Sequence, residues 1–191
     1  MKNYNGLCER SYHLSKEKGW YETERSLSEA MMLMVSEVAE ATEEVRKGTP
    51  LVYQHDISNL VTPFDTNWDL KVKPEGELVE LADCVIRIAD TFGHNKWDLE
   101  KELSTIRTIK GSKSDWLSHF RVMTPLEQHM GVVATISYGL TDGVPRHLAL
   151  AVAKIEAIHE ARSYKVPFDI IIDYKHEYNK TRPHRHGGKL L

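Results

Sequence analysis

The chain contains little cysteine and no long apolar run. Its two cysteines, Cys8 and Cys84, lie far apart without CxxC spacing, which argues against a disulfide framework. We expect both to be buried, reduced thiols. No apolar stretch approaches the roughly 20 residues that cross a bilayer, and the first four residues lack the apolar core of a secretion signal. We therefore expect a cytoplasmic protein with no membrane partner.

An excess of basic residues is also missing. The formal net charge is −3, so the chain has no overall basic field to hold a nucleic-acid backbone, and we expect no nucleic-acid partner. The composition is 41% hydrophobic and 28% charged, which is ordinary for a globular protein with a sizeable core. At 191 residues the chain fits one domain, or two small helical halves that share a core.

Helical periodicity dominates the sequence. Apolar residues recur at three- and four-residue steps from Ser26 to Lys47, where Ser26 or Ser28 can cap a helix and Gly48 can end it. Similar patterns predict further helices at Glu77–Phe92, which Gly93 ends, and at Leu99–Ile109, Pro125–Leu140, Arg146–Ser163 and Pro167–Thr181. No segment indicates a dominant sheet. The predicted fold class is all-α, with a four-helix-bundle-like arrangement in a single domain, residues 1–191.

Three segments interrupt this pattern. Residues 49–75 form a predicted long loop with short β-prone pieces such as Leu51–Tyr53 and Leu70–Val72, and the loop could contain a hairpin. This loop could reach over a ligand or be a structural embellishment. Residues 110–114 predict a connector. The tail 182–191 is basic and rich in His and Gly, and it could be a solvated end, a metal or nucleic-acid arm, or a guide for phosphate groups.

The two parts of the chain show a weak internal echo. Residues 76–103 and 147–173 each contain a helix, a short break, an aromatic residue followed by aspartate, and another helix. An ancient duplication would give a carboxylate-bearing half, residues 16–110, and a degenerate half, residues 115–191, that together act as a pseudo-dimer. Chance similarity between amphipathic helices explains the same pattern, so both interpretations stay open.

The most informative residues are acidic. With about 100° per residue in a helix, Glu37, Glu40 and Glu44 share one stripe that borders the apolar one. Glu80 and Asp83 repeat the three-residue spacing on the second long helix. Carboxylates at the edge of a core repel one another and lose solvation, and a hard divalent cation such as Mg²⁺ relieves both costs. The alternative is a set of solvated surface carboxylates, supported along the helices by Arg46, Lys47 or Arg87.

The order of several segments points to a known family. The segments are Lys18-Gly19-Trp20-Tyr21, Ser36-Glu37-Val38-Ala39-Glu40-Ala41-Thr42-Glu43-Glu44-Val45-Arg46, Lys73-Pro74-Glu75-Gly76, Glu80-Leu81-Ala82-Asp83-Cys84-Val85-Ile86-Arg87-Ile88-Ala89-Asp90, and the stretch from Lys175 to Lys189. Together they resemble MazG-like nucleoside triphosphate pyrophosphohydrolases of the all-α NTP pyrophosphatase superfamily. The match covers roughly residues 16–48, 73–100 and 165–189.

This resemblance implies an enzyme that hydrolyses a nucleoside triphosphate to the monophosphate and pyrophosphate. It implies Mg²⁺ as the cofactor, with Mn²⁺ as a substitute, held by Glu37, Glu40, Glu80 and Asp83. Glu44, or one of the four ligands, would orient or deprotonate the attacking water. Lys175 would act in catalysis and in substrate binding. The substrate-binding set is completed by Asn179, Arg182 and Trp20, the last of which could instead be a buried structural residue.

The sequence departs from the shorter family members, because about seventy residues separate the second carboxylate helix from the terminal one. This fits the duplication, whose second half offers Ala151 and Lys154 where a carboxylate pair is expected. We expect a homodimer. Two other classes compete with the enzyme. A di-iron protein is disfavoured because only one ExxH pair, Glu156 and His159, is present. A non-catalytic nucleotide sensor or partner-binding regulator remains the main alternative.

Overall fold

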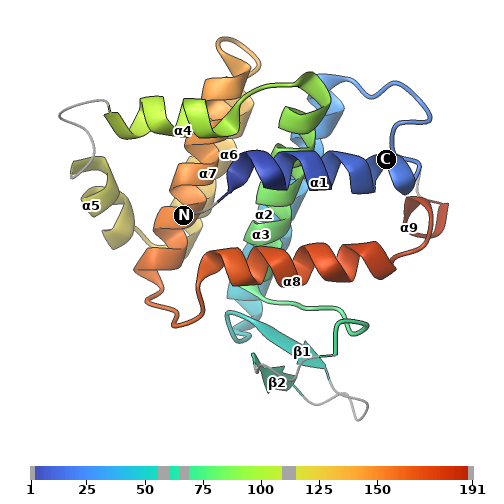
Figure 1. Ribbon diagram of the computed structural model, residues 1–191. Helices are drawn as coiled ribbons and strands as arrows, with labels where there is room; N and C mark the ends of the chain where they lie inside the picture. The colour runs from blue at the N-terminus through green and yellow to red at the C-terminus, as the bar shows by residue number, and fades with distance from the viewer. Residues whose placement is uncertain (1–2, 56–60, 65–68, 109–114, 189–191) are drawn as a thin grey trace.

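A computed structural model describes residues 3–55, 61–64, 69–108 and 115–188. The described chain is predominantly helical, so the all-α fold class is confirmed (Figure 1). The elements are α1 (Tyr4–Glu17), α2 (Leu27–Lys47), β1 (Tyr53–His55), β2 (Val61–Pro63), α3 (Glu77–Asn95), α4 (Leu99–Thr108), α5 (Asp115–Val122), α6 (Pro125–Tyr138), α7 (Val144–Ala161), α8 (Phe168–Thr181) and α9 (Arg185–Gly188). None of the helices in these residues has the length and apolar character that a membrane span requires.

Helix α3 forms the centre of the fold. It contacts α1, α2, α7 and α8, and nearly every residue from Glu77 to Phe92 is buried. A helix that is covered on all sides needs apolar residues around most of its circumference, which α3 supplies. Figure 1 shows α1 and α8 crossing in front of α2 and α3, while α6 and α7 pack together beside them. The acidic residues of α3, together with Glu37 and Glu44 of α2, therefore lie in the interior of the helical assembly.

The start and end of α2 match the sequence signals. Ser26 is the N-cap residue: its side chain accepts a hydrogen bond from the backbone N–H of Glu29, and the Glu29 carboxylate accepts one from the backbone N–H of Ser26. This reciprocal capping box satisfies two donors that the helix itself cannot pair. Gly48 ends the helix in the left-handed conformation, with φ of 69°.

The prediction that Gly93 ends the second long helix was wrong. Helix α3 continues to Asn95 and ends at Lys96, which has a φ of 56°. A Cβ atom added to Gly93 would lie 2.4 Å from the carbonyl oxygen of Cys8 on α1. This glycine is therefore explained by the close approach of α1 to α3. The remaining predicted helices, α4, α6, α7 and α8, begin and end within two residues of their predicted limits; Ile109 and the connector 110–114 lie outside the described residues.

Helices α1, α5 and the short α9 are absent from the sequence prediction. The buried stripe of α1 consists of only Tyr4, Leu7, Cys8 and Ser11, which is too narrow and polar to stand out as a periodic pattern. The helix begins with Asn3, whose side chain accepts a hydrogen bond from Gly6 N at 2.7 Å. This missed helix matters because it covers one side of α3.

The long segment between α2 and α3 contains a hairpin. Strands β1 and β2 pair antiparallel, with Gln54 opposite Thr62. The β-prone stretch Leu70–Val72 forms no strand. Tyr53 and Glu75 exchange two backbone hydrogen bonds of 2.9 Å, which anchor the end of the segment close to the start of α3. The segment therefore ends next to the first acidic residues of α3.

Candidate functional site

Three carboxylates from two helices meet where α2 packs against α3. Glu37 and Glu40 of α2 and Glu80 of α3 each offer one oxygen, and these three atoms lie within 4.8 Å of one another. Glu37 and Glu80 are buried, whereas Glu40 is exposed. We call these residues the acidic triad. Carboxylate oxygens at this spacing could hold a divalent metal ion.

The local sequence explains the positions of these side chains. On α2 the buried residues Met34, Val38 and Ala41 face the core, and Glu37 lies within this same stripe. On α3 both faces are buried, so Glu80 and Asp83 cannot avoid the interior. The packing of two apolar helix faces thus forces acidic groups together, and the free energy of core formation offsets their repulsion and desolvation.

A partly buried arginine pairs with the first member of the triad. The Nε atom of Arg87 on α3 donates a hydrogen bond of 2.6 Å to Oε1 of Glu37. Burial nevertheless raises the pKa of Glu37 to about 7, and the negative charge of Asp83 adds to this effect. Glu37 is therefore close to half protonated at neutral pH when no further cation is present.

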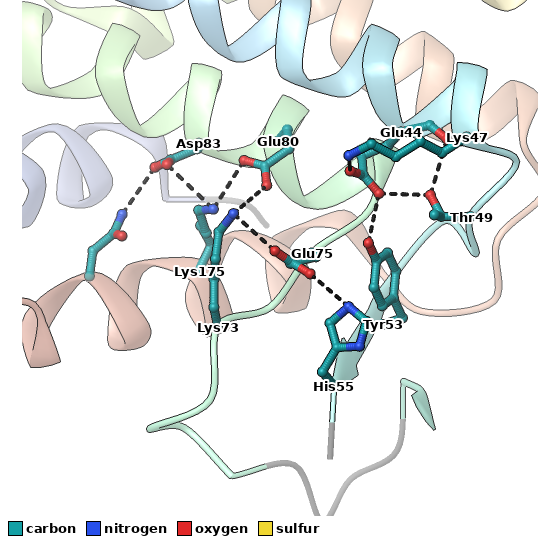
Figure 2. Close-up of polar contacts among 11 residues, drawn as sticks. Glu44, Lys47, Thr49, Tyr53, His55, Lys73, Glu75, Glu80, Asp83 and Lys175 are labelled. Carbon is teal, nitrogen blue, oxygen red and sulfur yellow. Dashed lines mark hydrogen bonds and ion pairs between the residues drawn. The ribbon is translucent and has the colours of Figure 1, made fainter. Parts of the chain in front are cut away.

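A buried lysine pairs with the α3 carboxylates. Figure 2 shows Lys175 of α8 between Glu80 and Asp83; its Nζ atom lies 3.1 Å from Oε2 of Glu80 and 3.5 Å from Oδ2 of Asp83. Only 1% of Lys175 is exposed. Burial lowers its pKa, but the surrounding carboxylates outweigh burial and raise the pKa above the usual range. Asn179, one turn along α8, donates from Nδ2 to Oδ1 of Asp83 at 3.0 Å.

The long segment before α3 also contributes a charge. Lys73 lies 3.2 Å from Glu75 and 3.6 Å from Glu80 (Figure 2). It lines the same pocket as the acidic triad, with a volume of about 220 Å³. The charged lining comprises the carboxylates Glu37, Glu40, Glu80 and Asp83 and the bases Lys73, Arg87, Lys175 and Arg182. We call this the carboxylate pocket. Its lining has four acidic and four basic side chains, so its formal net charge is zero.

The structure brings together most of the residues that the sequence predicts for a site. Trp20, Lys175 and Arg182 line the carboxylate pocket, and Asn179 reaches its wall through Asp83. Asp83 lines the pocket but is not part of the triad, and its carboxylate contacts Lys175 and Asn179. Metal binding and substrate binding by these groups remain predictions.

Glu44 lies outside the carboxylate pocket. Its Oε2 accepts hydrogen bonds from Thr49 Oγ1 at 2.7 Å and from the Tyr53 hydroxyl at 2.9 Å, and its Oε1 lies 3.0 Å from Lys47 Nζ (Figure 2). It lines a neighbouring groove with Glu40 and Glu80. These contacts anchor the start of the hairpin segment to α2.

Two residues of the pocket received no site role in the sequence analysis. Arg87 was considered only as support for surface carboxylates, yet it lies four residues after Asp83 and so on the same face of α3. That spacing could have identified it. Lys73 belongs to a quoted segment, but no local pattern indicates that the loop would turn it toward Glu80.

The basic tail is bound to the segment that holds Trp20. The backbone N–H of Arg185 donates to Lys18 O at 2.9 Å, and its Nε donates to Gly19 O at 3.1 Å. The carboxylate of Glu22 lies 2.9 Å from Nε2 of His184 and 3.2 Å from Nη2 of Arg185. We call these contacts the tail clasp. The clasp joins the segment after α1 to the segment after α8. Trp20 from the first segment and Arg182 from the second both line the carboxylate pocket.

Comparisons with protein-family models, with curated proteins and with solved structures each find no match to this chain.

Proposed function

We propose that this protein hydrolyses a nucleoside triphosphate to the monophosphate and pyrophosphate in the carboxylate pocket, on a MazG-type, four-helix-bundle-like fold. The observation that supports this proposal most is the meeting of Glu37, Glu40 and Glu80 in a pocket that also holds four basic groups. Carboxylate oxygens suit Mg²⁺, and fixed cations suit phosphate oxygens, so one pocket offers partners for both parts of a metal–triphosphate complex.

The acidic triad has the hard oxygen ligands that Mg²⁺ prefers, and Mn²⁺ accepts the same set. In the proposal Glu37, Glu40 and Glu80 hold the ion and Asp83 borders it. When bound, Mg²⁺ neutralises charge on phosphate oxygens and makes a bound water more acidic. The exposed position of Glu40 leaves room on that side for water and substrate.

The basic residues of the chain then stabilise the phosphates. Lys73, Lys175 and Arg182 offer positive charges to the triphosphate, and their effect grows as negative charge builds on the departing pyrophosphate. A water oxygen attacks the α-phosphorus, the bond between that phosphorus and the α–β bridging oxygen breaks, and pyrophosphate departs with the bridging oxygen. Glu40 accepts the proton of the water, because it is the exposed carboxylate of the triad.

One observation favours a second candidate function, a nucleotide sensor without turnover. Arg87 already pairs with Glu37, and Lys175 already pairs with Glu80 and Asp83. A cluster that the protein balances by itself needs no ion for folding. Under this second proposal the pocket binds a triphosphate through its basic groups and releases it unchanged.

The proposal includes a homodimer and a duplicated origin of the two halves. Met32 of α2 and Met130 of α6 are 65% and 68% exposed, and these two helices are neighbours. A second copy that packed on these two helices would cover such exposed apolar side chains. In the second half, Lys154 donates to Gly131 O and Thr135 Oγ1, so a cation stands where the duplication would place a carboxylate. Sedimentation at twice the chain mass of 21.9 kDa would support the dimer.

The hydrolysis proposal is tested with the substitutions Glu40→Gln and Asp83→Asn. A panel of triphosphates is incubated with Mg²⁺, and pyrophosphate release is measured. Each substitution should reduce release at least about 100-fold while the helical circular dichroism is retained. Glu43→Gln is the matched control, because Glu43 lies on the same helix but pairs with Arg46 and does not line the carboxylate pocket.

The possible results separate the two candidate functions. Unchanged turnover in both pocket variants would remove Glu40 and Asp83 from the mechanism. Triphosphate binding by the wild-type protein without pyrophosphate release would favour the sensor.

A further inference from the structure

The segment that leads into α3 carries a lysine between two carboxylates. The Nζ atom of Lys73 lies 3.2 Å from Oε1 of Glu75 and 3.6 Å from Oε1 of Glu80 (Figure 2). The Lys73 side chain is 44% exposed, whereas that of Glu80 is 4% exposed. A long side chain that is partly open to solvent can change its partner, and a buried one cannot. Lys73 is therefore the movable member of this group.

The place of Glu75 is set by its backbone. Its N–H and C=O groups are both paired with Tyr53, and the next residue, Gly76, has a φ of 115°. A Cβ atom added to Gly76 would lie 2.5 Å from the carbonyl oxygen of Leu51, which accepts a hydrogen bond from Leu78 N at 3.1 Å. A glycine allows this close approach and this φ. The junction between the hairpin segment and α3 therefore does not depend on the Glu75 side chain.

The Glu75 carboxylate lies between the hairpin and the lysine. Figure 2 shows it between His55 of β1 and Lys73, and its Oε2 atom is 3.3 Å from Nε2 of His55. The ring of His55 in turn packs edge-on against the ring of Tyr53, with 5.4 Å between the ring centres. A lysine side chain has much rotamer freedom, and a fixed carboxylate beside it limits that freedom. Glu75 therefore keeps Lys73 close to the carboxylate pocket.

Lys73 and a metal ion would compete for the same carboxylate. Glu80 belongs to the acidic triad, and it already contacts Lys175 as well as Lys73. A divalent ion held by Glu80 would repel the ammonium group of Lys73, because like charges a few ångströms apart raise each other's energy. The more exposed lysine yields first. Glu75 then gives Lys73 a second carboxylate within reach, so the lysine stays at the pocket when it leaves Glu80.

Lys73 also lies at the border of two cavities. The neighbouring groove has a volume of about 490 Å³ and shares Glu40, Lys73 and Glu80 with the carboxylate pocket. Among the described residues two bases line this groove, Lys47 and Lys73, and Lys47 is paired with Glu44 at 3.0 Å. Lys73 is the one of the two that lines the carboxylate pocket as well. Phosphates that extend from the pocket toward the groove therefore meet Lys73.

We propose that Glu75 is a positioning residue, which holds Lys73 at the edge of the carboxylate pocket so that Lys73 passes from Glu80 to the phosphate oxygens when a metal ion takes Glu80. This inference deepens the proposed function and rests on it, because it requires a metal-bound phosphate chain in the pocket. Glu75 itself touches no substrate. Its effect on binding is exerted through Lys73, and that dependence distinguishes positioning from a structural role.

Binding of Mg²⁺ alone tests the competition. The full chain is titrated by calorimetry at about pH 8, as wild type, Glu75→Ala, Lys73→Met and the double variant. Lys73→Met should bind Mg²⁺ about threefold more tightly, because the competing cation is gone. Glu75→Ala should bind it about fivefold more weakly, because Lys73 loses its second carboxylate. In the Lys73→Met background the same Glu75→Ala change should alter the affinity less than about twofold, since two residues that act as a unit are not additive.

Binding of inorganic pyrophosphate at saturating Mg²⁺ tests the phosphate contact. Lys73→Met should weaken it about tenfold through loss of a charge-assisted hydrogen bond, and Glu75→Ala about fivefold. Glu75→Gln keeps an acceptor oxygen for Lys73 and should recover part of this loss. The thermal midpoint shows that each variant is folded. Lys71→Met is the matched control, because Lys71 is an exposed lysine of the same segment that lines neither the pocket nor the groove, and it should change neither affinity.

The outcomes distinguish this inference from the proposed function. Equal weakening of Mg²⁺ binding by Glu75→Ala with and without Lys73 would overturn the inference, as would unchanged pyrophosphate binding in Lys73→Met. Dependence of the Glu75→Ala effect on Lys73, without pyrophosphate release from any triphosphate, would support the positioning role and contradict hydrolysis. Pyrophosphate release by the wild-type protein without that dependence would support hydrolysis and contradict the inference.

Discussion

The guanidinium of Arg87 lies 2.6 Å from the carboxylate of Glu37, and this ion pair joins α3 to α2 beside the carboxylate pocket. The Glu37 side chain is only 5% exposed, so water can do little to replace Arg87. Removing one partner of a buried ion pair is costly because the other charge remains uncompensated. The pair therefore links the stability of the fold to the charge state of the pocket.

We predict that Arg87→Gln lowers the free energy of unfolding by about 3 kcal/mol in the presence of a chelator, and that millimolar Mg²⁺ restores part of this loss. The ion can replace the missing positive charge next to Glu37. Urea denaturation at about pH 8 with and without Mg²⁺ measures both effects. The control is Arg46→Gln, which removes an exposed ion pair with Glu43 and should cost less than about 1 kcal/mol. Equal losses in the two variants would contradict the structural importance of Arg87.

A second prediction concerns pH. Burial, assisted by the charge of Asp83, raises the pKa of Glu37 from 4.5 to about 7. Between about pH 4.5 and pH 7 the folded protein retains a proton that the unfolded chain releases, so the stability that this group contributes is present in acid and is lost as the pH rises through this window. A divalent ion requires the ionised carboxylate, so the affinity of the site for the ion rises as the pH rises.

Mg²⁺ affinity should therefore rise about tenfold between pH 6 and pH 8, as expected for one competing proton with a pKa of about 7. Calorimetric titration at several pH values measures this dependence. In Glu37→Gln the affinity should be lower and nearly independent of pH over the same range. If the Mg²⁺ affinity of this variant still rises with pH, the competing proton belongs to another group.

A third prediction concerns the tail clasp. Gly19 has a φ of 81°, and a Cβ atom there would lie 2.0 Å from Nε2 of His184. Gly19→Ala should cost about 1–2 kcal/mol of stability through backbone strain, and it should also raise KM severalfold because the displaced tail carries Arg182 away from the pocket. Gly48→Ala is a matched control: its φ is 69°, but a Cβ atom there meets nothing within 4 Å. A similar loss of stability with unchanged KM is expected for Gly48→Ala, and an unchanged KM in Gly19→Ala would separate the tail from substrate binding.

The fold was predictable where local signals agreed. The capping box at Ser26 and the left-handed Gly48 act within a few residues, and the sequence analysis located both ends of α2 correctly. Gly93 shows the limit of such signals. A glycine near a helix end suggests a stop, whereas here it allows Cys8 of α1 to approach α3, and this contact depends on tertiary structure.

Part of the site was also predictable from local signals. Helical spacing placed Glu37 and Glu40 on one stripe, and only the packing of α2 on α3 decided that Glu80 would join them. The wall that α1 forms beside α3 was beyond reach from the sequence, since its short buried stripe gives little periodic signal. Residues that act across helix contacts leave few traces in a single sequence.

Glu44 provides the last test, because its helical spacing and its contacts suggest different roles. Spacing places it on the stripe of Glu37, but its two oxygens are engaged by Thr49, Tyr53 and Lys47. In Glu44→Gln the amide can present only one acceptor oxygen to these donors, so the free energy of unfolding should fall by about 1–2 kcal/mol.

Turnover of Glu44→Gln should stay within about twofold of the wild type, because the amide remains outside the carboxylate pocket and the triad is unchanged. Thermal denaturation and pyrophosphate release measured on the same preparation separate the two effects. Tyr53→Phe removes one of the same hydrogen bonds without touching an acidic residue, and it should reproduce the stability loss in part. If Glu44→Gln instead loses activity as strongly as Glu40→Gln, then Glu44 takes part in water activation, and its contacts with the hairpin segment must open during the reaction.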